Sequence, residues 1–388
     1  MASQFITHNP KFALSGFGTE IWKHVVFFSP RRKTDKPLHI NSPVIRYIDE
    51  TSQDQTQYYL SFLKPNITNE FNNNSKRLKT THYMLKKAYV SFNGAVGFDC
   101  YTIFLQTDFA KNATTAKVVG HYHEVVVTGY LWATYNFGHS ISDFIIPLLL
   151  LPESIRWRSH IIVFSMPFLY DPFLDLLGFT QDRRIYLPEN TERYIAADVL
   201  HCFANDTFYI SQWGPNTYRF KRFVHQKLDL DKIPSTDYCF TNRPKGKARH
   251  IHNLDEIISA TKSKFPTIDW KFVRDDHKEL IECAKDFKKI KFLFGPVGSN
   301  LFKSIFMADH TVVICVTAFF LEHPLPYFCS SCKIFELQYD SITTHHTGVG
   351  SPIDVDDALF HIGKCLKVLE TRTWKAYSEE DAINRNKG

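Results

Sequence analysis

Short apolar runs alternate with amphipathic stretches along most of the chain after about residue 120. Apolar runs rich in Val, Ile and Phe are typical of buried strands, and amphipathic stretches of about ten residues are typical of helices that cover a sheet. Neighbouring parallel strands need a crossover connection, which a helix of this length supplies. The pattern therefore predicts an α/β protein.

The predicted elements form two series, separated by a break at Trp213-Gly-Pro215. In the first series we expect strands over 124–132, 159–165, 184–187 and 195–203, and helices over 140–151 and 171–178. In the second we expect an amphipathic stretch over 218–228, strands over 237–241, 269–273, 290–294, 311–316 and 333–337, and helices over 254–263, 277–287, 299–307 and 354–369. The predicted domains are a polar extension of strands and loops (1–118), two α/β domains (119–215 and 216–340), and a C-terminal loop and helix (341–388).

Composition agrees with two globular cores and excludes a mainly disordered chain, since 44% of the 388 residues are apolar. The net charge of +6 is spread without long like-charge blocks, whereas nucleic-acid binders usually concentrate such charge, so no nucleic-acid partner is expected. Eight cysteines are too few and too irregular for a disulfide scaffold. Cys329 and Cys332 form the one C-x-x-C pair and are expected to be buried or loop thiols.

Nothing in the sequence indicates a membrane span or a secretory signal. The N-terminus has no basic region followed by an apolar run, and the longest apolar stretch, 144–151, contains Pro147 and is far shorter than the ~20 residues that span a bilayer. We therefore expect no transmembrane segment, and a protein of the cytosol or of the cytosolic face of a membrane.

The segment 292–301 joins an apolar strand to a glycine-containing turn and a helix. At such a junction the free backbone amides and the positive end of the helix dipole face outward, and glycine lets an anion approach closely. Gly298, Ser299 and Asn300 are thus candidates for binding a phosphate group. The alternative is a tight turn in which Ser299 or Asn300 caps the helix.

A basic loop over 241–256 follows another predicted strand of the same domain. Its cations could hold a diphosphate by charge-assisted hydrogen bonds, although a loop of this kind is more often solvated surface. The cations are Arg243, Lys245, Lys247 and Arg249. Asn253 or Asp255 is expected to cap the next helix. Both anion-binding candidates lie at the carboxyl ends of strands, where α/β sheets bind ligands.

His139 and Asp143 are four residues apart at the start of a predicted helix. On one helix face the carboxylate could orient the imidazole, an arrangement that suits removal of a proton from a hydroxyl. A capping or packing role for His139 is the alternative. The acidic string Asp354, Asp356 and Asp357 could suggest a metal, but acids in a first helical turn more often satisfy amides and the dipole, so no metal site is expected.

Three segments together resemble the family-61 glycosyltransferases, which include O-linked N-acetylglucosaminyltransferases of EGF domains and plant xylan xylosyl- and arabinosyltransferases. The segments are Asn136-Phe-Gly-His139-x-x-x-Asp143-x-x-x-Pro147, Asn242-Arg243 through Arg249-x-x-x-Asn253-x-x-Glu256, and Gly295-Pro-Val-Gly298-Ser-Asn-Leu301-x-x-x-x-Phe306-Met307. Their order and spacing reinforce one another, over roughly residues 120 to 340.

The resemblance implies a GT-B-like fold, with two Rossmann-like domains facing a cleft, and inverting transfer from a nucleotide-diphospho-sugar to a hydroxyl of a glycan or glycoprotein. It implies no cofactor and no obligatory metal. On the matching positions, the residues expected to bind or support substrate are Asn136, Arg243, Arg249, Asn253, Gly298, Ser299 and Asn300. His139 and Asp143 would lie beside the acceptor hydroxyl as the catalytic pair.

The chain departs from the family pattern at two positions. Val297 stands where the family usually has histidine, and Cys315 where the family commonly has glutamate. The first change removes a polar group near the expected donor, and the second removes an acid at the end of the next strand. An alternative function is therefore that of a catalytically silent relative that binds a sugar nucleotide or a glycan.

Overall fold

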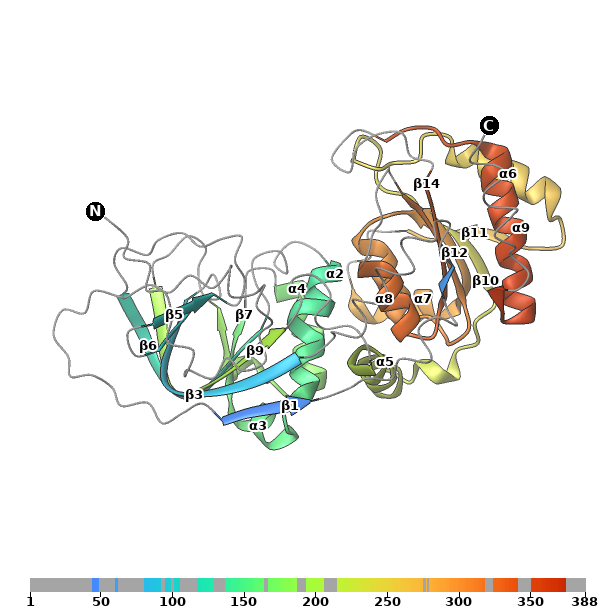
Figure 1. Cartoon of the computed structure of the whole chain (residues 1–388). Coiled ribbons are helices and arrows are strands. Elements are labelled where there is room, and N and C mark those ends of the chain that lie inside the picture. The colour runs from blue at the N-terminus through green and yellow to red at the C-terminus, as the bar shows by residue number, and fades with distance from the viewer. Residues whose placement is uncertain are drawn as a thin grey trace. The chain divides into compact units, whose positions relative to one another are not determined.

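The computed structural model of the 388-residue chain forms two compact units, each built on a β-sheet (Figure 1). It describes residues 44–48, 60–61, 80–91, 95–98, 101–104, 117–128, 137–163, 167–186, 193–205, 215–274, 277, 279–317, 324–340 and 350–374. Unit 1 comprises residues 1–50 and 77–212, and unit 2 comprises residues 51–76 and 213–388. The chain thus passes from one unit to the other three times.

Unit 1 contains an eight-stranded mixed sheet. Its strands are β1 (Val44–Ile48), β3 (Thr80–Ser91), β4 (Ala95–Phe98), β5 (Tyr101–Phe104), β6 (Lys117–Val127), β7 (His160–Val163), β8 (Arg184–Tyr186) and β9 (Arg193–Asn205). The order is β5-β4-β3-β9-β6-β7-β8, with β1 paired to β3. Strands β9, β6, β7 and β8 are parallel, whereas β3 pairs antiparallel with β9, β1 and β4. Strands of the predicted N-terminal extension therefore complete this sheet.

The helices of unit 1 differ in extent from those that the sequence pattern predicts. They are α2 (Phe137–His139), the π-helix η4 (Ser140–Ile145), the 3-10 helices η5 (Ile146–Leu150) and η6 (Gln181–Arg183), α3 (Glu153–Arg158) and α4 (Pro167–Leu177). The continuous helix expected over 140–151 is wrong. Pro147 lies in the first turn of η5, and because proline lacks an N–H it interrupts the α-helical ladder there. The Thr128 hydroxyl donates to the Phe144 carbonyl at 2.6 Å and ties η4 to the end of β6.

Unit 2 contains a parallel six-stranded sheet. Its strands are β2 (Leu60–Ser61), β10 (Asp237–Phe240), β11 (Trp270–Phe272), β12 (Ile290–Pro296), β13 (Val312–Thr317) and β14 (Phe335–Asp340). The order is β11-β10-β12-β13-β14-β2. Counted from β10, the first five strands follow the doubly wound order 2-1-3-4-5, in which the connections change direction between β10 and β12. Such sheets bind ligands at that switch point, and the order is compatible with a Rossmann-like fold.

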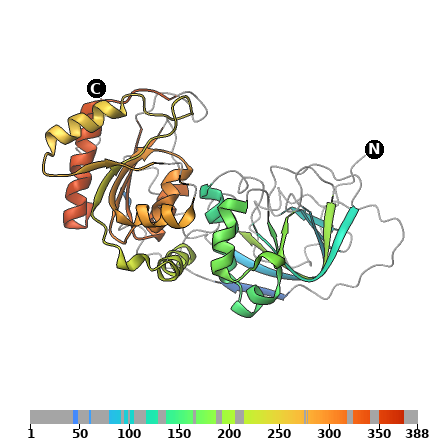
Figure 2. The same ribbon diagram turned by 180° about the vertical axis from the view of Figure 1, so that it is seen from behind.

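Helices cover both faces of this sheet, as the two opposite views show (Figures 1 and 2). They are α5 (Pro215–Lys227), η7 (Leu230–Lys232), α6 (Leu254–Lys264), α7 (Leu280–Lys289), the 3-10 helix η8 (Ser299–Phe306), α8 (Pro324–Ser331) and α9 (Val355–Thr371). Helices α6 and α9 pack together on one face, and α7, η8, α8 and α5 form the other layer. The buried side chains of Phe240, Phe292, Phe294, Ile314 and Leu337 meet α6 and α9 in the core.

The alternation of strands and helices predicted for 237–316 is confirmed, with two differences in detail. The helix after β12 is a 3-10 helix, and α7 begins at Leu280 rather than at 277. Helix α8, between β13 and β14, was not expected. Its first turn holds Pro324 and Pro326, which an α-helix tolerates only near its start, so the local pattern did not indicate a helix.

Candidate functional site

The turn between β12 and η8 lies at the switch point of the unit 2 sheet. Gly298 has φ +157° and ψ 175°, a region that essentially only glycine occupies. A Cβ placed on Gly298 would lie 2.5 Å from Nη1 of Arg243. Glycine is therefore needed for this arginine to reach the backbone of the turn.

Ser299 and Asn300 are the first two residues of η8 and do not cap it. The N-cap position is Gly298, and no side-chain capping bond forms there. The first N–H groups of a helix have no acceptor within the helix, and they carry the positive end of its dipole. The start of η8 therefore presents backbone donors beside Arg243.

Arg249 approaches the same turn. Its Nη1 would lie 3.9 Å from a Cβ on Gly298, so two guanidinium groups converge on one glycine. Planar guanidinium groups bind phosphate through paired hydrogen bonds. The arrangement can therefore hold an anion such as a diphosphate.

The Asn242 side chain closes the loop that carries both arginines. Its Oδ1 accepts the N–H groups of Arg243 (2.9 Å) and Ile251 (3.0 Å), and its Nδ2 donates to the Ile251 carbonyl (2.8 Å). The Arg243 carbonyl accepts Nδ1 of His250 at 2.6 Å. Sequence reasoning gave Asn242 no role, although an asparagine directly after a strand is a recognised turn signal.

Asn253 fastens the other end of this loop to a distant segment of the chain. Its Oδ1 accepts the Ile353 N–H and its Nδ2 donates to the Ile353 carbonyl, both at 2.9 Å. The His252 N–H also donates to the Ser351 carbonyl at 3.0 Å. Asn253 occupies the N-cap position of α6, as one of the two expected residues, but its side chain forms no capping hydrogen bond. Asn253 thus fixes the loop that carries Arg243 and Arg249 (residues 241–256, called the arginine loop below) to the backbone of Ile353.

Lys245 and Lys247 are exposed in the same loop. The Lys247 N–H donates to the Pro244 carbonyl at 3.0 Å, which closes a β-turn, and Gly246 within it has φ +81°. For these two lysines the solvated-surface interpretation is the better one.

His139 and Asp143 meet in unit 1 as the sequence predicts. Nδ1 of His139 lies 2.6 Å from Oδ2 of Asp143, and Oγ of Ser142 lies 2.6 Å from Oδ1. The His139 side chain is 30% exposed and that of Asp143 14% exposed. The pair spans the junction of α2 and the π-helix η4, a helix type that is frequent at functional sites. A carboxylate on Nδ1 fixes the ring and leaves Nε2 as its basic nitrogen.

The structure thus brings Arg243, Arg249 and Gly298 together in unit 2, and His139 with Asp143 in unit 1. The expected substrate-binding residue Asn136 lies outside the described residues. At the two positions that depart from the family pattern, Val297 is 1% exposed and Cys315 is fully buried.

The acidic string at the start of α9 caps that helix. Oδ1 of Asp354 accepts the Asp357 N–H at 2.7 Å, which confirms the capping interpretation. In the described part of the chain, no group of three or more His, Cys, Asp or Glu side chains is arranged to hold a metal ion.

Cys329 and Cys332 are both buried, as expected. Burial raises the pKa of Cys332 to about 12, so this thiol is protonated at neutral pH. None of the described helices is both long and apolar enough to cross a bilayer.

Residues 137–314 match the family model of glycosyltransferase 61. The matched region begins with α2, ends within β13, and includes the His139–Asp143 pair, the arginine loop and the Gly298 turn. No curated protein matches the chain. Residues 137–314 therefore form a glycosyltransferase family 61 domain, which supports a glycosyltransferase activity.

Proposed function

We propose that the protein is an inverting glycosyltransferase that moves a sugar from a nucleotide-diphospho-sugar to a hydroxyl of a glycan or a protein. The observation that carries this proposal is the convergence of Arg243 and Arg249 on Gly298 at the switch point between β10 and β12. In this proposal the two units are the Rossmann-like domains of a GT-B architecture, with the donor bound on unit 2.

The donor site is suited to a diphosphate leaving group. When the bond between the anomeric carbon and the diphosphate oxygen breaks, the electron pair leaves with the diphosphate. Arg243, Arg249 and the first N–H groups of η8 would stabilise that negative charge, since donors fixed in place before reaction are the most effective. Each charge-assisted hydrogen bond contributes about 1.5–3 kcal/mol. These groups supply positive charge where other enzymes use a metal, so we expect no metal requirement.

The acceptor is activated by the pair in unit 1. Asp143 holds His139 with Nδ1 toward the carboxylate, so Nε2 can take the proton from the acceptor hydroxyl. The oxygen then attacks the anomeric carbon from the side opposite the diphosphate. A single displacement of this kind inverts the configuration at that carbon.

Two measurements test the proposal. A ligand that prefers the folded form raises the melting temperature, so a panel of UDP, GDP, CDP and ADP should include at least one nucleotide that stabilises the protein. Incubation with the matching nucleotide-sugar should release nucleoside diphosphate. The Asp143→Asn/Arg243→Ala double variant should lose this turnover, and Lys245→Ala, a surface change in the same loop, should keep it.

One observation favours a second candidate function. The buried Val297 replaces the histidine that the family usually has beside the donor, which suits a relative that binds a sugar nucleotide without turning it over. Calorimetric binding of the donor with no product after long incubation would select that function. Full turnover in the double variant would instead contradict the roles proposed for Asp143 and Arg243.

A further inference from the structure

Helix α5 buries a stripe of polar side chains. Thr217 and Lys221 are 0% exposed and His225 is 1% exposed, and their spacing of four residues puts them on one helix face. The buried face of a helix is normally apolar, and a buried lysine is strongly unfavourable unless its charge is matched. Such a stripe calls for partners on the elements that α5 packs against, which include η7, η8 and α8.

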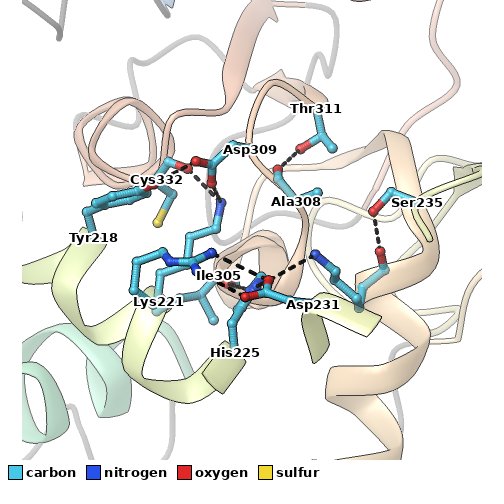
Figure 3. A network of polar contacts seen from close by, with 12 residues as sticks. Tyr218, Lys221, His225, Asp231, Ser235, Ile305, Ala308, Asp309, Thr311 and Cys332 are labelled. Atoms are coloured by element: carbon cyan, nitrogen blue, oxygen red, sulfur yellow. Dashed lines mark hydrogen bonds and ion pairs between the residues drawn. The ribbon is translucent and has the colours of Figure 1, made fainter. Parts of the chain in front are cut away.

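Lys221 binds the end of α8 and an aspartate that follows η8. Its Nζ lies 2.7 Å from the Cys332 carbonyl and 2.9 Å from Oδ1 of Asp309 (Figure 3). The Tyr218 hydroxyl donates to Oδ2 of the same aspartate at 2.7 Å. Burial alone would raise the pKa of Asp309, but Lys221 and Tyr218 bring it below its usual value, so the carboxylate is ionised. The charge of Lys221 is thus matched by the Asp309 carboxylate and by a carbonyl group at the C-terminal end of α8.

His225 contacts the last turn of η8. Its Nε2 lies 3.1 Å from the Ile305 carbonyl, and its Nδ1 lies 3.2 Å from Oδ1 of Asp231 (Figure 3). Carbonyl groups in a last helical turn lack donors within the helix, so they need partners from elsewhere. Burial, together with Lys221 and Lys288, lowers the pKa of His225 to about 4.

The other end of η8 is the anion-binding turn. The helix spans Ser299–Phe306, so its eight residues join Gly298 to the contacts of α5 over roughly 16 Å at ~2 Å per residue. A 3-10 helix has poorer hydrogen-bond geometry than an α-helix, and its placement depends more on surrounding contacts. Fixing its C-terminal end fixes where its first N–H groups lie.

We propose that Lys221 and His225 are positioning residues for the anion-binding turn: they anchor the C-terminal end of η8, and thereby hold its first residues against Arg243. The inference rests on the proposed function only for what the turn binds. The anchoring itself can be measured without a ligand.

Hydrogen exchange in the ligand-free chain tests the anchoring directly. In Lys221→Met we expect the amides of 299–306 to exchange at least tenfold faster than in the unchanged protein, with those of β13 little affected. Lys227→Met is the matched control, because Lys227 is an exposed lysine on the same helix. Equal exchange of 299–306 in the two variants would overturn the proposal.

Binding then tests the consequence for the site, with UDP and inorganic pyrophosphate as probes. We expect the Kd of whichever probe the unchanged protein binds to rise about fivefold or more in Lys221→Met and not in Lys227→Met. His225→Phe, which removes the donor, should behave like Lys221→Met, and His225→Gln, which keeps one, should restore part of the affinity. If the unchanged protein binds neither probe, the proposed function fails at that step, and the exchange result still decides the anchoring.

Loss of folding is separated from loss of positioning by melting curves. Should Lys221→Met alone unfold, the Lys221→Met/Asp309→Asn double variant removes both charges and takes its place in the exchange and binding measurements. Variants that keep a native melting transition and bind with unchanged Kd would contradict a positioning role.

Discussion

At the scale of single residues, Arg243 reaches the turn after β12 because residue 298 has no side chain. An added Cβ would lie 2.5 Å from the guanidinium group, which must then move away from the turn. The arginine is long and flexible, so the displacement should affect binding more than folding.

We therefore expect Gly298→Ala to weaken UDP binding about tenfold or more, and the strained φ to lower the free energy of unfolding by about 1–3 kcal/mol. Calorimetry and denaturant unfolding measure the two effects. Gly246→Ala is the matched control, because its φ of +81° is also strained but its Cβ would meet nothing within 4 Å. A similar loss of affinity in both variants would show that backbone strain, not the approach of Arg243, is responsible.

Glu336 is another residue whose surroundings decide its chemistry. It lies fully buried in β14, and neither carboxylate oxygen makes a hydrogen bond of normal geometry within the described residues. Burial raises the pKa of Glu336 to about 8, and Gln338 offsets only part of that effect. The acid is therefore protonated in the folded protein at neutral pH.

This shift predicts a pH dependence of stability. Because the folded-state pKa lies above the unfolded value of 4.5, the contribution of the protonated acid is complete below about pH 4.5 and is lost as pH rises toward 8. Between these limits, Glu336→Gln should gain on the unchanged protein by up to about 1.4 kcal/mol per pH unit. Denaturant unfolding at pH 5, 6.5 and 8 measures this. Glu282→Gln, an exposed change on α7, should show no such trend, and a pH-independent difference for Glu336→Gln would refute the assignment.

At the scale of elements, the arginine loop is held by a segment a hundred residues further along the chain. Asn253 binds both backbone groups of Ile353, and Ile251 forms a parallel bridge to Ser351. The loop is thus a fixed part of unit 2, as a binding site made of loop residues requires.

Asn253→Ala should destabilise the protein by about 1–3 kcal/mol, because two partly buried backbone groups of Ile353 lose their partners. The same change should weaken UDP binding, since the loop that carries both arginines loses one fastening. Asn253→Asp keeps the acceptor for the Ile353 N–H, so its stability and UDP affinity should lie between those of Asn253→Ala and the unchanged protein. Unfolding and calorimetric titrations report both effects. Unchanged UDP affinity in Asn253→Ala would mean that Asn242 alone fixes the arginines.

The sequence predicted elements where local pattern decides them. The strands and helices of 237–316 follow from apolar periodicity, and the meeting of His139 with Asp143 follows from their spacing. The pattern predicted a continuous helix that Pro147 interrupts, and it did not predict α8, whose first turn contains Pro324. The support of the loop by Asn253 could not be predicted, because its partner Ile353 is distant in sequence and no local signal connects the two.

At the scale of the whole molecule, the assignment of the N-terminal segments to the two units could not be predicted from the sequence alone. Residues 51–76 belong to unit 2 although unit 1 begins before them and resumes after them. Strand β2, in this segment, pairs with β14. Pairings between such distant segments depend on tertiary contacts that periodicity does not encode.

The division into two units predicts which amides a bound nucleotide should protect from hydrogen exchange. Hydrogen exchange with saturating UDP should show protection at 242–254 and 297–301, around the switch point of unit 2. The amides of 195–203, in β9 of unit 1, should exchange as before and serve as the internal control. Protection confined to unit 1 would place the nucleotide elsewhere and contradict the donor site.

The fastening of Asn253 to Ile353 also bears on how much of the chain the site needs. The family match ends at residue 314. The loop that carries Arg243 and Arg249 is nevertheless hydrogen-bonded to Ser351 and Ile353, and side chains of α9 pack in the core of the same unit. Premature termination or proteolytic cleavage shortly before residue 350 would keep every matched motif. It would still remove the hydrogen-bond partners of the loop, Ser351 and Ile353. A shortened protein of that kind would retain the family match but lose the contacts that hold the loop of Arg243 and Arg249.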